Sequence, residues 1–173
     1  MLKPILGLYL YFFVKVITDN LITSNLLCKS CGNQLTSLKY LINKPSPLAL
    51  KSWNTSIFHS KSKYTHSLNQ SIQHKENLAL IQLLENPQGS HFELITVNKA
   101  NVHFLNNTKS IADTWFPNFK WTICLCPHCF IHIGWYFESI FDTNDFFFRI
   151  LVKNLFDEDY EDNLIIEPKF KLY

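Results

Sequence analysis

Short apolar runs separated by turn residues dominate the second half of the chain and predict β-strands. These runs are rich in aromatic and β-branched residues, which fit the pleated, half-buried surface of a sheet. Residues 146–156 form a further apolar run that is compatible with either a strand or a helix. We expect strands at residues 78–84, 92–97, 101–105, 121–125 and 131–137.

The residues between these runs predict tight turns and therefore antiparallel pairing. Residues 86–89 read Asn-Pro-Gln-Gly, and residues 106–107 and 116–118 carry the turn signals Asn-Asn and Phe-Pro-Asn. Such residues fix or relax the backbone where a strand ends. Connections this short join antiparallel neighbours, because a parallel crossover needs a dozen or more residues and usually a helix. We therefore predict a mainly β fold of antiparallel sheets.

Composition limits the chain to one domain and excludes one class of partner. Of the 173 residues, 47% are apolar, which is enough for one hydrophobic core. The net charge of +2 does not predict a phosphate-binding surface, so no nucleic-acid partner is expected. Residues 157–162 read Asp-Glu-Asp-Tyr-Glu-Asp and predict an acidic C-terminal tail over residues 157–173.

The N-terminus combines one lysine at position 3 with an apolar stretch from Pro4 to Val14. The stretch is shorter than the roughly 20 residues that a membrane-spanning helix needs, but it has the length of the apolar part of a signal peptide. We predict a signal peptide over residues 1–24 and a secreted protein. The alternative is that residues 5–17 form a buried strand or helix of a cytoplasmic protein.

A polar segment interrupts the first half of the chain. Residues 44–75 are rich in Ser, Lys, Asn, His and Thr and contain a Pro-Ser-Pro sequence. Such a composition buries little apolar surface. We therefore predict a long exposed insertion within a domain that spans residues 25–156. Trp53 lies in this segment, and the sequence assigns it no role.

Four of the five cysteines form two matched pairs. Cys28 and Cys31 make one Cys-x-x-Cys motif, and Cys126 and Cys129 make a second. The two-residue gap lets both thiolates of a pair face one metal, and four thiolates complete a closed tetrahedral site. We predict a structural Zn²⁺ that joins distant parts of the chain. Disulfide bonds, or a redox function of either pair, are the alternatives.

Cys124 is the remaining cysteine. Its one-residue separation from Cys126 is a poor gap for ligands of the same metal, which favours a buried thiol. The alternative interpretation is a catalytic nucleophile, although no base stands beside it in the sequence.

Three tryptophans flank the second cysteine pair: Trp115, Trp121 and Trp135. On a strand, Trp135 and Phe137 share a face, and Trp121 opens the strand that leads to Cys126. The rings can therefore wall one pocket. The alternative is a plain aromatic core.

These motifs together resemble the CULT domain family, the thalidomide-binding domains of the cereblon type, which also occur alone in secreted proteins. The resemblance covers about residues 26–151, with residues 44–75 as an insertion. It rests on the cysteine pairs, an Asn-Pro-x-Gly turn, a Trp-Phe-Pro segment and a His-x-Gly-Trp-x-Phe run. The matching residues are Cys28, Cys31, Asn86, Pro87, Gly89, Glu93, Thr96, Val97, residues 115–122, Cys126, Cys129, His132, Gly134, Trp135 and Phe137.

The resemblance implies a fold and a ligand. The fold is the β-tent, two antiparallel sheets set at an angle and joined by zinc. The ligand is a glutarimide or related cyclic imide, such as thalidomide or the cyclic imide at the C-terminus of a damaged protein, held in the tryptophan cage against backbone groups of residues 113–115. The implied ligand-binding residues are Asn86, Asp113, Thr114, Trp115, Trp121, Trp135 and Phe137.

The chain departs from the family pattern beside the cage. The family often has His and Ser before the first tryptophan, where this chain has Asp113 and Thr114, and Phe92 replaces a His that usually precedes the Glu. These changes bear on the affinity and charge of the pocket. Because only 27 residues precede Cys28, we expect neither a Lon-like domain nor a cullin-adaptor-binding region.

The sequence thus favours a non-enzymatic, zinc-stabilised module that binds cyclic imides. One alternative is an enzyme similar to the methionine sulfoxide reductases, which share the β-tent and the zinc, with Cys124 as nucleophile. The other is a secreted structural or interaction domain in which the aromatic residues serve only as core.

Overall fold

The computed structural model describes residues 25–55 and 78–157. The predicted signal peptide, residues 56–75 of the predicted insertion and nearly all of the acidic tail lie outside the described residues, so these remain predictions. Within the described ranges, ten strands and two short 3₁₀ turns are present. Their bounds are β1 (Asn25–Cys28), β2 (Gln34–Ser37), η1 (Leu38–Tyr40), β3 (Lys51–Thr55), β4 (Ala79–Glu85), β5 (His91–Val97), β6 (His103–Phe104), β7 (Phe119–Leu125), β8 (His132–Ser139), β9 (Phe146–Leu151), η2 (Val152–Asn154) and β10 (Leu155–Asp157).

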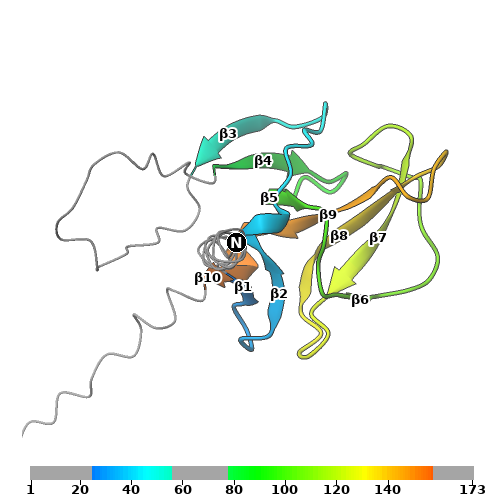
Figure 1. Cartoon of the computed structure of the whole chain (residues 1–173). Coiled ribbons are helices and arrows are strands. Elements are labelled where there is room, and N and C mark those ends of the chain that lie inside the picture. The colour runs from blue at the N-terminus through cyan, green and yellow to red at the C-terminus, as the bar shows by residue number, and fades with distance from the viewer. Residues whose placement is uncertain (1–24, 56–77, 158–173) are drawn as a thin grey trace, which may run out of the picture.

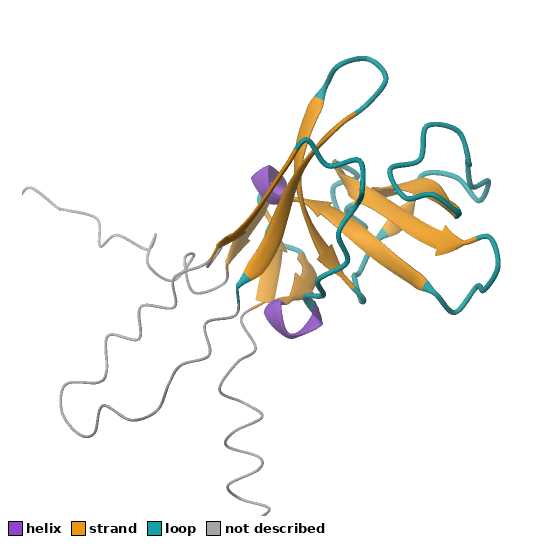
Figure 2. Ribbon diagram, turned by 90° about the horizontal axis from the view of Figure 1, so that it is seen from above, coloured by secondary structure: helices purple, strands orange, loops and turns teal. Residues whose placement is uncertain are grey.

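The strands form two antiparallel sheets, which confirms the predicted fold class (Figures 1 and 2). In the described part of the chain, the small sheet has three strands in the order β10-β1-β2, and the large sheet has seven in the order β3-β4-β5-β9-β8-β7-β6. The segment after β2 joins the sheets, since the backbone N–H of Ile42 donates to the carbonyl of Thr96 on β5. The described residues include no helix long and apolar enough to cross a membrane.

The large sheet is covered on both faces, which explains why its central strands are nearly continuous apolar runs. Along β9, Phe148 and Ile150 face a cluster that includes residues of the small sheet. Phe147 and Leu151 face the opposite way, into an aromatic cluster with Trp115. Alternate side chains of a strand point to opposite faces, so one strand supplies both clusters. The domain therefore has a mixed core on one face and an aromatic core on the other.

Most predicted strands are present, with bounds shifted by one or two residues, whereas the predicted run at 101–105 shortens to β6. Residues 146–156 are neither a single strand nor a helix. They form β9, a 3₁₀ turn and the start of β10, which pairs with β1 in the other sheet. The run was ambiguous because it crosses from one sheet to the other.

Residues 44–55 of the predicted insertion are mostly exposed, but they contain a strand that the sequence did not predict and one buried residue, Ser46. Residues 51–55 form β3, an edge strand that pairs antiparallel with β4. Trp53 packs against the mixed core, and Ser46 is buried with its backbone N–H donating to Gln82 Oε1 at 2.8 Å. A polar residue such as Ser46 can be buried when its polar groups have hydrogen-bond partners, and the composition of the segment does not reveal those partners.

Candidate metal centre and aromatic pocket

The four paired cysteines converge on one point. Their Sγ atoms all lie within 4.8 Å of one another. The Sγ atoms of Cys28 and Cys129 are 3.7 Å apart, and those of Cys31 and Cys126 are 3.6 Å apart. Sulfurs about 2.3 Å from one central ion in tetrahedral geometry lie roughly 3.8 Å apart, whereas a disulfide needs about 2.05 Å. The arrangement can hold a metal ion and is not a pair of disulfides.

Each cysteine pair sits on a tight turn. In the turn between β1 and β2, Gly32 takes a φ of 72° and its N–H donates to the carbonyl of Cys28. In the turn between β7 and β8, the N–H of Phe130 donates to the carbonyl of Cys126. These two turns belong to different sheets, so a metal bound by all four thiolates joins the sheets.

The local electrostatics favour the deprotonated form of one of the four cysteines, Cys129. A hydrogen bond from the backbone N–H of Ile131 lowers the pKa of Cys129 to about 6. Burial raises the pKa of Cys28 to about 12. Thiolate charge packed into so small a volume calls for a cation, because four sulfurs this close repel one another when deprotonated.

Cys124 stands apart from this cluster. Its side chain is fully buried within β7, and burial raises the pKa of its thiol. A reactive cysteine needs a lowered pKa and access to solvent. The structure therefore favours the interpretation of Cys124 as a core thiol.

A pocket of about 340 Å³ opens on the aromatic face of the large sheet. Trp115 and Trp135 are each only 8% exposed, and their rings meet edge to face with centroids 4.8 Å apart. Six of the seven residues predicted from the resemblance line this pocket: Asn86, Asp113, Trp115, Trp121, Trp135 and Phe137. The structure thus brings the three predicted tryptophans around one cavity.

Hydrogen bonds fix two of the indoles. Trp115 Nε1 donates to the carbonyl of Glu85 at 2.7 Å, and Trp121 Nε1 donates to the carbonyl of Ala112 at 2.8 Å. The acceptors lie at the end of β4 and in the loop before Trp115. With both N–H groups bonded to protein, these indoles present apolar faces to a ligand.

The loop residues beside the tryptophans differ in their positions. Asp113 has a φ of 53° and lines the pocket. Thr114 does not line it; its hydroxyl donates to the carbonyl of Phe116 at 3.2 Å. Asn86 lines the pocket wall while its Oδ1 accepts the backbone N–H of Ser90 at 2.7 Å, which holds the turn in shape. Ligand contacts by any of these three residues stay predictions.

Phe92, whose replacement of a family His the sequence placed beside the cage, lines the pocket, and so do four residues that the sequence did not assign to it: Pro87, Gln88, Ile123 and His132. The ring of Phe92 lies 5.0 Å from that of Trp135, and the ring of His132 lies 4.5 Å from it on edge. Burial is the main cause of the lowered pKa of His132. The period-two alternation of a strand sets the face on which Phe92 on β5 and His132 on β8 lie. The two side chains reach one site only because strands distant in the sequence pair in the sheet.

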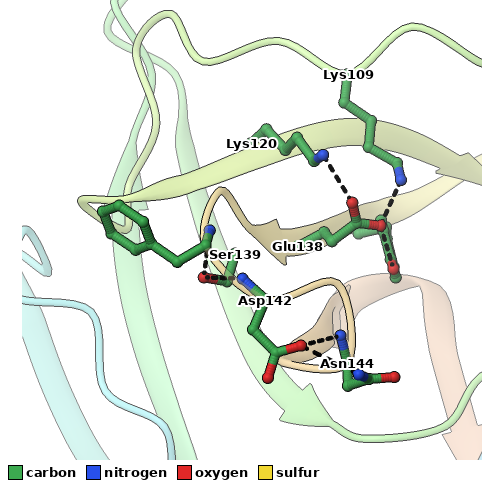
Figure 3. A network of polar contacts seen from close by, with 8 residues as sticks. Lys109, Lys120, Glu138, Ser139, Asp142 and Asn144 are labelled. Atoms are coloured by element: carbon green, nitrogen blue, oxygen red, sulfur yellow. Dashed lines mark hydrogen bonds and ion pairs between the residues drawn. The ribbon is translucent and has the colours of Figure 1, made fainter.

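An ion network connects the loop between β6 and β7, which carries Asp113 and Trp115, to strands β7 and β8 (Figure 3). The carboxylate of Glu138 on β8 pairs with Lys109 in that loop and with Lys120 on β7 at 2.8 Å, and it accepts the hydroxyl of Tyr136 at 2.9 Å. Burial raises the pKa of Glu138, but the three hydrogen bonds outweigh it and lower the pKa to about 2. Glu138 is therefore charged at neutral pH.

Fold and site define a β domain with a four-cysteine cluster that can hold a metal ion and, on the aromatic face of its large sheet, a pocket walled by tryptophans. The chain is similar to cereblon: it is 40% identical over 55 residues to the protein of Danio rerio, 42% over 55 residues to that of Xenopus tropicalis and 35% over 57 residues to that of Drosophila melanogaster. The match covers 32% of this chain but only 13%, 12% and 10% of these relatives. No protein-family model matches the chain. The similarity supports a cereblon-like domain.

Proposed function

We propose that this protein is a non-enzymatic, zinc-stabilised module whose tryptophan pocket binds small cyclic imides. The observation that carries the proposal is the single cavity walled by Trp115, Trp121 and Trp135. Indole faces bury a small flat ring, and the remaining walls combine apolar side chains with a few polar groups that can orient it. The similarity to cereblon and the resemblance to thalidomide-binding domains point to the same ligand class.

The pocket can also read the polar edge of such a ring. Asp113 lines the cavity, and among the described residues neither its backbone N–H nor its carbonyl makes a hydrogen bond within the protein. A cyclic imide offers one N–H donor flanked by two carbonyl acceptors. Backbone groups of Asp113 can therefore pair with the imide edge while the indoles cover its faces. The indole faces that cover the ring strengthen these bonds by excluding water from them.

Zinc is the proposed metal because the ligand set is made only of thiolates. Four cysteine sulfurs in tetrahedral spacing suit Zn²⁺ and leave no position open for substrate. The metal then acts as a structural link between the sheets. Metal analysis of the purified protein, together with the sulfur–metal distance from X-ray absorption, tests this assignment.

A titration with thalidomide tests the binding function. The full chain is mixed with increasing thalidomide while tryptophan fluorescence is followed, with Trp121→Ala as the variant that removes one wall. We expect saturable quenching in the wild type and its loss in the variant. Thalidomide methylated on the imide nitrogen is the matched ligand control, because it keeps the rings but lacks the donor. Equal binding of both compounds, or no binding to a folded and metal-loaded protein, would refute the proposal.

A further inference from the structure

Ser46 connects the predicted insertion to the pocket. Its side chain is 5% exposed, and its hydroxyl donates to the backbone carbonyl of Trp115 at 2.6 Å. The same oxygen accepts the backbone N–H of Leu48 at 3.1 Å. Trp115 is thus held at two places, by Ser46 at its carbonyl and by the carbonyl of Glu85 at its indole nitrogen.

Gln82 on β4 holds Ser46 in turn. Its Oε1 accepts the backbone N–H of Ser46 at 2.8 Å, and its Nε2 donates to the carbonyl of Ser46 at 3.3 Å and to Ser52 Oγ at 2.9 Å. One amide therefore satisfies both backbone groups of one serine, as a strand neighbour would. This pairing aims the serine hydroxyl at Trp115.

Arg149 on β9 determines which way the Gln82 amide points. The guanidinium is fully buried; it donates to Gln82 Oε1 at 3.1 Å and to the hydroxyl of Thr96. Arginine is only a donor, so the amide must turn its oxygen toward Arg149; the same oxygen accepts the Ser46 N–H, and the NH₂ donates to the Ser46 carbonyl. Among the described residues no carboxylate forms an ion pair with Arg149, and its Nε has no hydrogen-bond partner.

A buried cation without a carboxylate is expensive, and its retention calls for a role. Burial lowers the pKa of Arg149 to about 9, which leaves the group charged at neutral pH. Its guanidinium also lies 5.5 Å from the ring centroid of Phe116, the residue after Trp115. Arg149 therefore contacts both Gln82, which holds Ser46, and Phe116, which follows Trp115 in the chain.

We propose that Ser46, Gln82 and Arg149, here called the Ser46 network, are positioning residues that set the orientation of Trp115 and thereby the affinity of the pocket. None of the three lines the pocket. They act through Trp115: charge on Arg149 orients the amide, the amide orients Ser46, and Ser46 binds the Trp115 carbonyl. The consequence for affinity rests on the proposed function, whereas the consequence for Trp115 does not.

Ser46→Ala tests the network with two readouts on the full, metal-loaded chain. The first is hydrogen exchange of the Trp115 indole N–H, followed by NMR without ligand. Loss of the serine bond frees the Trp115 backbone, so we expect this N–H to exchange about tenfold faster. The second is the dissociation constant for thalidomide, which we expect to rise about five- to tenfold.

Thr36→Val is the matched control. Thr36 on β2 is 4% exposed, and its hydroxyl donates to the backbone carbonyl of Lys99 at 2.6 Å. Its removal deletes a hydroxyl-to-carbonyl bond of the same length, partly buried and away from the pocket. We expect the free energy of unfolding to fall by a similar amount. The Trp115 indole N–H should exchange no faster than this fall in global stability accounts for. Should Ser46→Ala fail to fold, Ser46→Cys keeps a weaker donor and gives an intermediate effect.

Each outcome decides one part of the inference. Faster Trp115 exchange and weaker binding in the Ser46 variant, with neither in the control, support it. Trp115 exchange equal in the Ser46 and Thr36 variants overturns the positioning role, whatever binding shows. Faster exchange with unchanged affinity overturns the link to binding. Faster exchange in a protein whose wild type binds no imide leaves the positioning role standing and removes the proposed function instead.

Discussion

Replacement of Glu138 by glutamine tests whether the ion network of Figure 3 stabilises the fold. The glutamine keeps the size of the side chain and removes its charge. Lys109, Lys120 and Tyr136 then lose a carboxylate partner that is only 8% exposed. Removing one member of a buried charge network leaves the others without compensation, so the free energy of unfolding should fall.

The magnitude follows from the pKa of Glu138, which falls from 4.5 to about 2 on folding. That difference corresponds to about 3 kcal/mol in favour of the charged form. Partial exposure of both lysines weakens their attraction, so we expect about 2 kcal/mol. Because the folded pKa is the lower one, the stabilisation is fully present above about pH 4.5. It is lost as the pH falls toward 2.

Urea unfolding of wild type and variant between pH 7 and pH 2 measures this contribution. The two curves of unfolding free energy should differ by about 2 kcal/mol at pH 7 and converge toward pH 2. Asp145→Asn is the control, since its partner Lys44 and Asp145 are 31% and 48% exposed and the pair should contribute under about 1 kcal/mol. A Glu138 variant as stable as wild type at pH 7, or a difference that persists unchanged at pH 2, would refute this reasoning.

Three further perturbations test other parts of the structure. Complete removal of the metal with a chelator should lower the thermal unfolding midpoint sharply, because a structural metal contributes folding free energy; an unchanged midpoint by calorimetry contradicts that role. Gly134→Ala should destabilise the fold by about 3 kcal/mol, since an added Cβ would lie 1.9 Å from the backbone oxygen of Arg149, and urea unfolding measures the loss. Cys124→Ser should leave any thiol-dependent reductase activity of the protein unchanged, because burial raises the pKa of that thiol; loss of such activity in the variant would favour the enzyme reading.

The sequence predicted those parts of the fold that depend on local order. Strands β4, β5, β7 and β8 follow from short apolar runs and from the turns between them. Three pocket tryptophans could be found because residues 115–135 lie on one hairpin and the loop before it. The two cysteine pairs could be found because the Cys-x-x-Cys spacing is a property of a single turn.

The missed parts depend on contacts between distant residues. Ser46 is buried among hydrogen-bond partners that are distant in the sequence. Gln82 and Trp115 stand 36 and 69 positions away, so the local sequence does not reveal them. His132 on β8 meets Phe92 on β5 in the pocket only because β5 pairs with β9, and β9 with β8. Hydrophobic patterning reports which face of a strand is buried, but not which strand lies next to it.

The small sheet has a consequence for the order in which the protein can fold as it is synthesised. Among the described strands β1 leaves the ribosome first and can pair at once with β2, yet its other partner β10 follows more than a hundred residues later, with Leu26 opposite Asp157. Contacts of such separation form late, because the intervening chain must first be closed into a loop. Cys28 and Cys31 therefore leave the ribosome as open thiols before the hairpin that carries Cys126 and Cys129 exists. A metal ion bound by all four thiolates can be captured only after that hairpin has formed, and until then the first pair is open to oxidation.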